Sequence, residues 1–194
     1  MDTLSIARLQ YRVELHDRFY RSDDYAHKSS EERIQELLLK QKYSALAVMR
    51  AERDGHESMT PLLLDGIIDM LAILSLCRQT AEAVFMAHGT ADEMDLHLLV
   101  IESNALYQLG ERAGCLTQRD LHTHAINLCT IVLNLYVRLF RQHCPGDDDY
   151  LALAIAVRLN TVESQSVFYP FLNIKLNQLL AKACPPAVSH DKAV

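Results

Sequence analysis

Residues 60–89 read TPLLLDGIIDMLAILSLCRQTAEAVFMAHG and predict one long, capped helix. Thr60 suits the N-cap, Pro61 suits the first helical position, and Gly89 suits a left-handed residue at the C-terminal end. The helix is apolar almost all the way round, so other parts of the protein must surround it. The stretch therefore predicts an all-α fold built around this helix as a central rod.

Two aspartates, Asp65 and Asp69, interrupt the apolar body of this helix. Because they are four residues apart, their carboxylates lie on one face of the helix, at a spacing that can hold a divalent cation. The competing interpretation is a narrow solvent-facing stripe, which Ala72 and Gln79 would continue, because charged side chains are seldom buried without a partner.

Capping signals predict the limits of further helices along the chain. The predicted starts are a Ser29–Glu32 capping box, a Thr90–Glu93 capping box and the N-cap Thr117, and the predicted stops are Gly55, Gly114 and Pro145–Gly146. A last helix is expected after Pro170. These signals divide most of the chain into helices joined by short connections.

Two segments alternate apolar and polar or small residues and could be strands, namely residues 9–15 and 151–159. A lone strand in a helical chain would leave its backbone groups unpaired, and alanines suit a closely packed helix, so we predict helices for both. The alternative for the N-terminal segment is an arm that pairs with another chain.

The predicted architecture is an all-α, single-domain bundle of about six helices with two long apolar core helices. The two core helices begin at Thr60 and Thr117, and each would be about 40 Å long. Residues 1–28 would form an N-terminal helix or arm plus a polar linker, residues 29–184 the helical bundle domain, and residues 185–194 a disordered tail.

Composition disfavours several classes of partner. The 194 residues carry a net charge of -6 with basic and acidic residues interspersed, so no basic face predicts nucleic-acid binding. The longest apolar run, Leu62 to Cys77, is shorter than the roughly 20 residues that span a bilayer, so no membrane contact is predicted. Five widely spaced cysteines without a C-x-x-C motif, and an N-terminus without a secretory signal, predict a cytoplasmic protein.

A metal site is the one enzymatic alternative that the residues suggest. Glu32 and Glu36 form a second acidic pair on the preceding helix, and together with Asp65 and Asp69 the set resembles the all-helical nucleotide pyrophosphohydrolases. That resemblance implies a phosphohydrolase in which the four carboxylates hold Mg²⁺ or Mn²⁺. The spacings differ from the family's E-x-x-E and E-x-x-D pairs, because both pairs here are separated by three residues.

No other catalytic or cofactor motif is present in the sequence, and the absence of any E-x-x-H argues against a di-iron bundle. The leading prediction is therefore a non-enzymatic cytoplasmic regulatory protein that acts by protein–protein interaction, for example by sequestering a transcription factor. Its two wide apolar helices favour a protein partner or a homodimer. A small-molecule-sensing bundle, with the ligand between the long helices, is a further alternative.

Overall fold

The structure is a computed structural model that describes residues 3–20, 27–55, 59–82, 92, 94–145, 148–165, 174–175 and 177–180. Within these residues it has no strand and six long helices, which confirms the all-α prediction. The helices are α1 (Thr3–Tyr20), α3 (Ser30–Arg53), α4 (Met59–Leu76), α6 (Asp95–Arg112), α7 (Gln118–His143) and α8 (Asp148–Ser164), and a 3-10 turn, η1 (Ala113–Cys115), precedes α7. Both ambiguous segments, 9–15 and 151–159, are helical.

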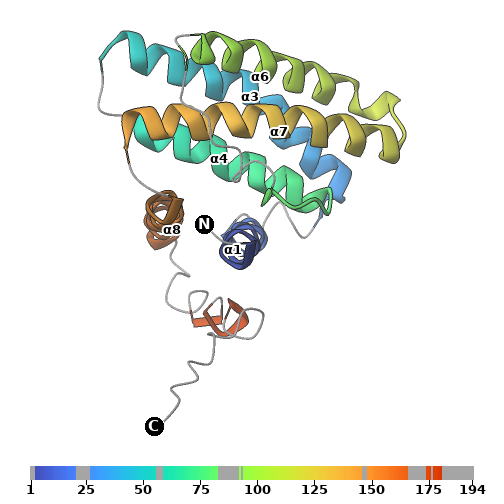
Figure 1. Cartoon of the computed structure of the whole chain (residues 1–194). Helices are drawn as coiled ribbons and strands as arrows, with labels where there is room; N and C mark the ends of the chain where they lie inside the picture. Colours follow the sequence, from blue (N-terminus) through green and yellow to red (C-terminus); the bar gives the residue numbers. More distant parts are fainter. Residues whose placement is uncertain are drawn as a thin grey trace.

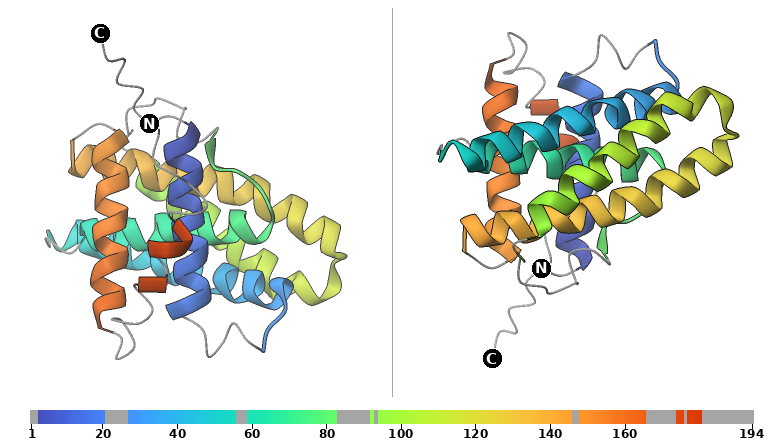
Figure 2. Two further views of the ribbon diagram at one scale, coloured as in Figure 1. Left: turned by 90° about the horizontal axis from the view of Figure 1, so that it is seen from below. Right: turned by 90° about the horizontal axis from the view of Figure 1, so that it is seen from above.

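Four of the helices form a closed antiparallel bundle. α3 packs against α4 and α6, and α7 packs against the same two helices, so α3 and α7 lie at opposite corners (Figure 1). The other two helices, α1 and α8, lie side by side and cross the α4 side of this bundle (Figure 2, left).

The position of α4 explains why it is apolar almost all the way round. It contacts α3 and α7 within the bundle and α1 and α8 across it. Its side chains at Leu63, Ile67, Met70 and Leu71 are completely buried, and each contributes on the order of 1.5–3 kcal/mol relative to an exposed side chain. α1 belongs to the same core, since Val13 is buried in it with these residues.

By length and composition alone, two described helices, α4 and α7, could cross a membrane. The bundle buries 67% of the apolar window in α4 and 50% of that in α7. Core helices commonly pass the same test, so this is weak evidence for a membrane span.

Several predicted helix ends are confirmed. Ser29 accepts a hydrogen bond from the Glu32 backbone while the Glu32 side chain accepts one from Ser29, which is the capping box expected for α3. Gly55 follows the C-cap with a φ of 65°, the left-handed conformation that favours glycine. Thr117 accepts a hydrogen bond from the backbone of Asp120 and caps α7, whose 26 residues give the expected length of about 39 Å.

The prediction for the central helix is wrong at its C-terminal end. α4 stops at Leu76 and spans 18 residues, or about 27 Å in place of 40 Å. Its last carbonyls are capped by the backbone N–H groups of Arg78 and Gln79, and Arg78 takes a left-handed φ of 57°. This is a Schellman ending built on a non-glycine residue, which the sequence does not signal. At the other end, Thr60 lies one residue inside the helix.

Three further predictions fall wholly or partly outside the described residues. Gly89, Thr90 and Glu93 lie outside them, and α6 begins at Asp95. Of the predicted last helix, residues 174–175 and 177–180 are described and are helical. Residues 185–194, predicted to be a disordered tail, also lie outside.

Candidate functional site

Glu32 and Glu36, the predicted metal ligands on α3, are engaged at its N-terminal end. Glu32 completes the capping box, and Glu36 forms an ion pair with Lys28. Among the residues that the structure describes, no three His, Cys, Asp or Glu side chains form a group that could hold a metal ion. The four predicted carboxylates are therefore not brought together.

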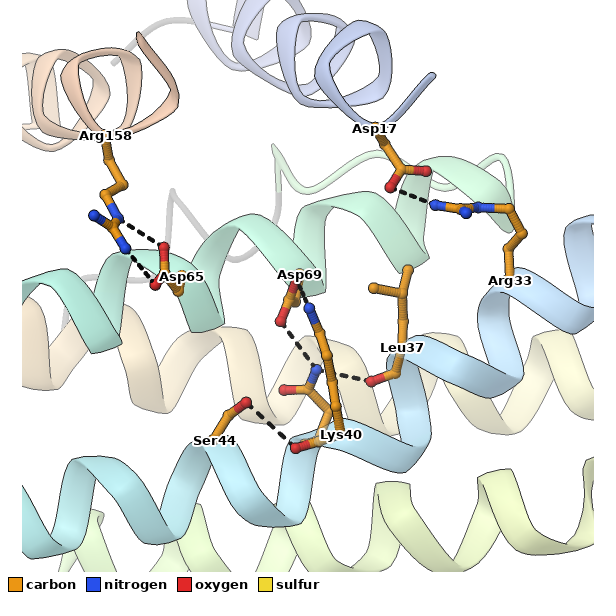
Figure 3. A network of polar contacts seen from close by, with 9 residues as sticks. Asp17, Arg33, Leu37, Lys40, Ser44, Asp65, Asp69 and Arg158 are labelled. Atoms are coloured by element: carbon orange, nitrogen blue, oxygen red, sulfur yellow. Dashed lines mark hydrogen bonds and ion pairs between the residues drawn. The ribbon is translucent and has the colours of Figure 1, made fainter. Parts of the chain in front are cut away.

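Asp65 and Asp69 on α4 face two different basic partners (Figure 3). Asp65 accepts two hydrogen bonds from Arg158 of α8, at 2.8 Å from Nε and 2.7 Å from Nη2. These bonds raise the pKa of the Arg158 guanidinium. Asp69 lies 2.6 Å from the Lys40 ammonium and accepts a longer, 3.4 Å hydrogen bond from the Gln41 amide, both on α3. The two aspartates thus connect α4 to its neighbours on two sides.

The interpretation of these aspartates as part of a solvent-facing stripe on the helix is wrong from Asp69 onward. The Asp65 side chain is 44% exposed, in agreement with that interpretation, but the Asp69 side chain is only 5% exposed. Ala72, the next residue of the stripe, is also buried. The physical reason is that α3 covers this face beyond Asp65, and Lys40 supplies the charge that allows the Asp69 carboxylate to be buried.

A cavity of about 480 Å³ lies where the two aspartates and their partners meet. α4 contributes Asp65 and Asp69, α3 contributes Lys40, and α8 contributes Arg158. Its apolar wall comes from the same three helices and includes Ala47, Leu62, Ile68, Leu159 and Val162, while α1 contributes the polar side chain of His16. Its volume is in the range of small-molecule sites, and its walls combine apolar surface with a few fixed charges. We call this space the aspartate cavity.

A buried charge cluster fixes the two crossing helices that close the cavity. The Arg12 guanidinium of α1 donates to both carboxylate oxygens of Glu163 on α8, and His16 Nδ1 lies 2.9 Å from Glu163 Oε1. Glu163 is completely buried. Burial raises its pKa, but the hydrogen bonds from His16 and Arg12 outweigh burial and hold the pKa below the ordinary value. The cluster sets how α8, and with it Arg158, lies over α4.

A second pair anchors α1 to α3. Arg33 Nη2 donates to Asp17 Oδ1 at 2.6 Å, and both side chains are buried (Figure 3). Together with the Arg158–Asp65 pair, it ties the crossing helices to the four-helix bundle at two points. The elements around the aspartate cavity are therefore held by charge as well as by apolar packing.

A second hollow, of about 300 Å³, lies between α1 and α8 and is mainly apolar. We call it the α1–α8 groove, and it is lined by Arg8, Leu9, Arg12, Ala152, Ala156 and Leu180. Leu180 comes from the C-terminal helical segment, which lies over the two helices (Figure 2, left). It packs against Leu15 of α1. The groove is therefore partly occupied by the chain's own C-terminal segment.

An exposed apolar stripe on α8 adjoins the groove. Leu153 and Val157 directly follow the groove residues Ala152 and Ala156, and their side chains are 60% and 55% exposed. Tyr150 continues the stripe one turn earlier, with 46% of its surface exposed. Because α8 also buries Leu151, Ile155 and Leu159 on its inner side, it is apolar on both faces.

The chain matches no protein-family model, no curated protein and no solved structure. What the protein binds has therefore to be inferred from its own cavity and groove. Sequence reasoning found the two aspartates of the cavity but missed Lys40, Arg158 and Glu163. The last two carried the same signal as Asp65 and Asp69, a lone charge within an apolar helix, here between Val157 and Leu159 and after Val162.

Proposed function

We propose that this protein is a non-enzymatic, cytoplasmic regulatory protein, and that the α1–α8 groove binds an amphipathic helix of a partner protein. The observation that carries the proposal is that the groove already accepts a helical segment, the chain's own residues 177–180, through Leu180. A surface that holds one apolar anchor from a helix suits recognition of another helix by the same physical means.

The chemistry of the groove indicates the kind of helix it would take. Ala152 and Ala156 stand one helical turn apart and present only methyl groups, so a helix backbone can approach closely. Exposed Arg8 on the rim favours acidic residues at the edge of the bound helix. The partner helix would therefore carry large apolar anchors on one face and carboxylates beside them.

The adjoining stripe on α8 enlarges this surface. A bound helix in the groove would also cover Leu153 and Val157, which are the most exposed apolar side chains on α8. Apolar residues of this size at the centre of an interface commonly supply much of the binding energy. Displacement of the C-terminal segment would also expose Leu15 of α1, because Leu15 and Leu180 form one buried cluster, against which Phe19 packs.

Site-specific photocrosslinking in cells tests the proposal. A photoreactive residue at position 157 should crosslink to a partner, and one at Ile131, an exposed apolar position on α7, is the matched control. A photoreactive residue at position 153 should give the same crosslink, and adding Val157→Asp to that protein should abolish it. Adding Leu180→Asp should strengthen the crosslink, because this substitution releases the C-terminal segment from the groove. A synthetic peptide of residues 171–184 should compete.

The crosslinked fragment decides the outcome. An amphipathic helical fragment with acidic flanks, lost in Val157→Asp and enhanced in Leu180→Asp, supports the proposal. A crosslinked fragment from a second copy of this chain would mean that the groove forms a homodimer contact and does not bind a different protein. No crosslink beyond that of the Ile131 control, or one insensitive to both variants, would overturn it.

A further inference from the structure

We infer that the outer face of α6 is a self-association surface, through which two copies of this chain pack with their α6 helices antiparallel. This surface is separate from the α1–α8 groove, because α6 lies at the corner of the four-helix bundle opposite α4, on the far side from α1 and α8 (Figure 1). A dimer formed through α6 therefore leaves the groove open, and it does not depend on what the groove binds.

The outer face of α6 carries a straight strip of side chains that the bundle does not cover. Successive members are three or four residues apart, so they share one face of the helix. The first three are apolar and protrude, since Met94, Leu98 and Ile101 are 55%, 39% and 60% exposed. The principal contacts of α6 are with α3 and α7, on its other sides. We call the set the α6 strip, and it consists of Met94, Leu98, Ile101, Ala105, Gln108 and Arg112.

The C-terminal half of the strip is hollow where the N-terminal half protrudes. A hollow of about 240 Å³ lies there between α6 and α7, with an apolar lining from Ala105, Leu109, Leu116 and Leu128. The protruding Met94 and the hollow thus occupy opposite ends of a strip about 27 Å long. A two-fold interface presents the same patch on both copies, so it requires a patch that complements itself in this way.

The spacing of the strip also sets the register of the two helices. Its midpoint lies between Ile101 and Ala105. A two-fold axis through that point places Ile101 of one copy against Ala105 of the other, and Leu98 of one copy against the hollow beside Gln108 of the other. A large side chain against a small one allows close packing. Parallel packing would instead place Ile101 against Ile101 and one hollow against the other.

Charge favours the same antiparallel register. The Arg112 guanidinium donates from Nε to the Gln108 carbonyl, and among the residues that the structure describes no carboxylate forms an ion pair with it. At the other end of the strip, Asp92 is exposed and accepts a 3.4 Å hydrogen bond from the Met94 backbone. Antiparallel helices bring Asp92 of each copy to Arg112 of the other, whereas parallel helices would bring like charges together.

Sedimentation velocity of the full-length protein, from low to high micromolar concentration, tests the inference. The natural protein should form a dimer, and Ile101→Glu should weaken its association at least about tenfold, because it places two carboxylates at the centre of the interface. Leu153→Glu on α8 is the matched control, since Leu153 is also 60% exposed. It should leave the association unchanged, and circular dichroism checks the folding of both variants.

Charge reversal tests the register. Arg112→Glu and Asp92→Arg should each weaken the dimer, and the double variant should restore it, because each copy then supplies the opposite charge to the other. A local structural effect of either substitution would not be rescued by the second. A natural protein that stays monomeric at every concentration, or association that is unaffected by Ile101→Glu or equally weakened by Leu153→Glu, would overturn the inference. A double variant that associates no better than the single ones would overturn the antiparallel register.

Discussion

The ring of Tyr136 on α7 lies directly against the backbone of Gly66 on α4. A Cβ atom on Gly66 would come within 2.3 Å of Tyr136 Cζ and 2.4 Å of Cε1, closer than non-bonded atoms can approach. The absence of a side chain at position 66 therefore sets how closely α4 and α7 pack, and it gives the fully buried Tyr136 ring its place in the core.

Gly66→Ala should consequently destabilise the protein, although alanine is the better helix former by about 1 kcal/mol. The added methyl must push away a fully buried ring, and overpacking of this kind costs about 1–3 kcal/mol. Urea unfolding followed by circular dichroism measures the difference. Gly114→Ala is the control, because a Cβ there meets no atom within 4 Å, and its stability should stay within about 0.5 kcal/mol of the natural protein.

A double variant shows whether the ring is the cause. In a Tyr136→Leu background the methyl of Gly66→Ala has room, so its additional cost should largely disappear. If Gly66→Ala were as costly in that background as in the natural protein, the contact with Tyr136 would not explain it.

Glu163→Gln should lower the stability of the protein at neutral pH, and it should make the stability depend less on pH in the acidic range. The folded-state pKa of Glu163 lies below its ordinary value of 4.5, despite the opposing effect of burial, because His16 and Arg12 stabilise the carboxylate. The resulting stabilisation is fully present above the unfolded-state pKa and is lost as the pH falls through the folded-state pKa. At neutral pH the variant leaves buried Arg12 uncompensated, which costs about 3–5 kcal/mol.

Urea unfolding at a series of pH values from about 7 to about 3 checks this prediction. The natural protein should lose stability below about pH 4.5 more steeply than the variant. Glu52→Gln provides a control, since Glu52 is an exposed carboxylate that lies near His143 at the surface. Parallel pH profiles for the natural protein and Glu163→Gln would contradict the assignment.

Arg78→Gly should stabilise the protein by about 1 kcal/mol. Arg78 holds a left-handed φ of 57° at the end of α4, a conformation that costs a non-glycine residue about 1–2 kcal/mol and glycine almost nothing. The greater freedom of glycine in the unfolded chain offsets part of the gain. Thermal unfolding measures the change, and Arg78→Ala, which keeps the Cβ, should leave the melting temperature nearly unaltered. A lower melting temperature for Arg78→Gly would refute the prediction.

The same residue marks the limit of what the sequence could predict about the fold. The Ser29–Glu32 capping box, the N-cap Thr117 and helical periodicity located most of the described helices, because those signals depend on neighbouring residues. The end of α4 was misplaced because its cap uses an arginine where glycine is usual, and Gly89 further along offered the expected signal. Local chemistry could not reveal that the backbone turns at Arg78.

The candidate site was predictable only in part, for a related reason. A charge inside an apolar helix needs a partner, and on this ground Asp65 and Asp69 were singled out; in the structure each of them pairs with a basic side chain. The partner itself depends on which helices become neighbours. Arg158 lies 93 residues from Asp65 along the chain, and only the crossing of α8 over α4 brings them together.

Asp69→Ala and Asp65→Ala should differ clearly in their effect on stability, although both remove a carboxylate paired with a basic side chain. The Asp69 side chain is 5% exposed, so its loss leaves a space in a buried region and removes a charge-assisted contact, at a cost of about 1.5–3 kcal/mol. Asp65 is 44% exposed, and its ion pair with Arg158 is screened by water, so its loss should cost no more than about 1 kcal/mol. Urea unfolding at low and high salt measures both, and only Asp65→Ala should approach the natural protein as salt rises. Equal losses of stability in the two variants, or a greater loss in Asp65→Ala, would contradict this prediction. The Arg158–Asp65 ion pair would then contribute at least as much as the buried Lys40–Asp69 contact to the electrostatic attachment of α4 to its neighbours.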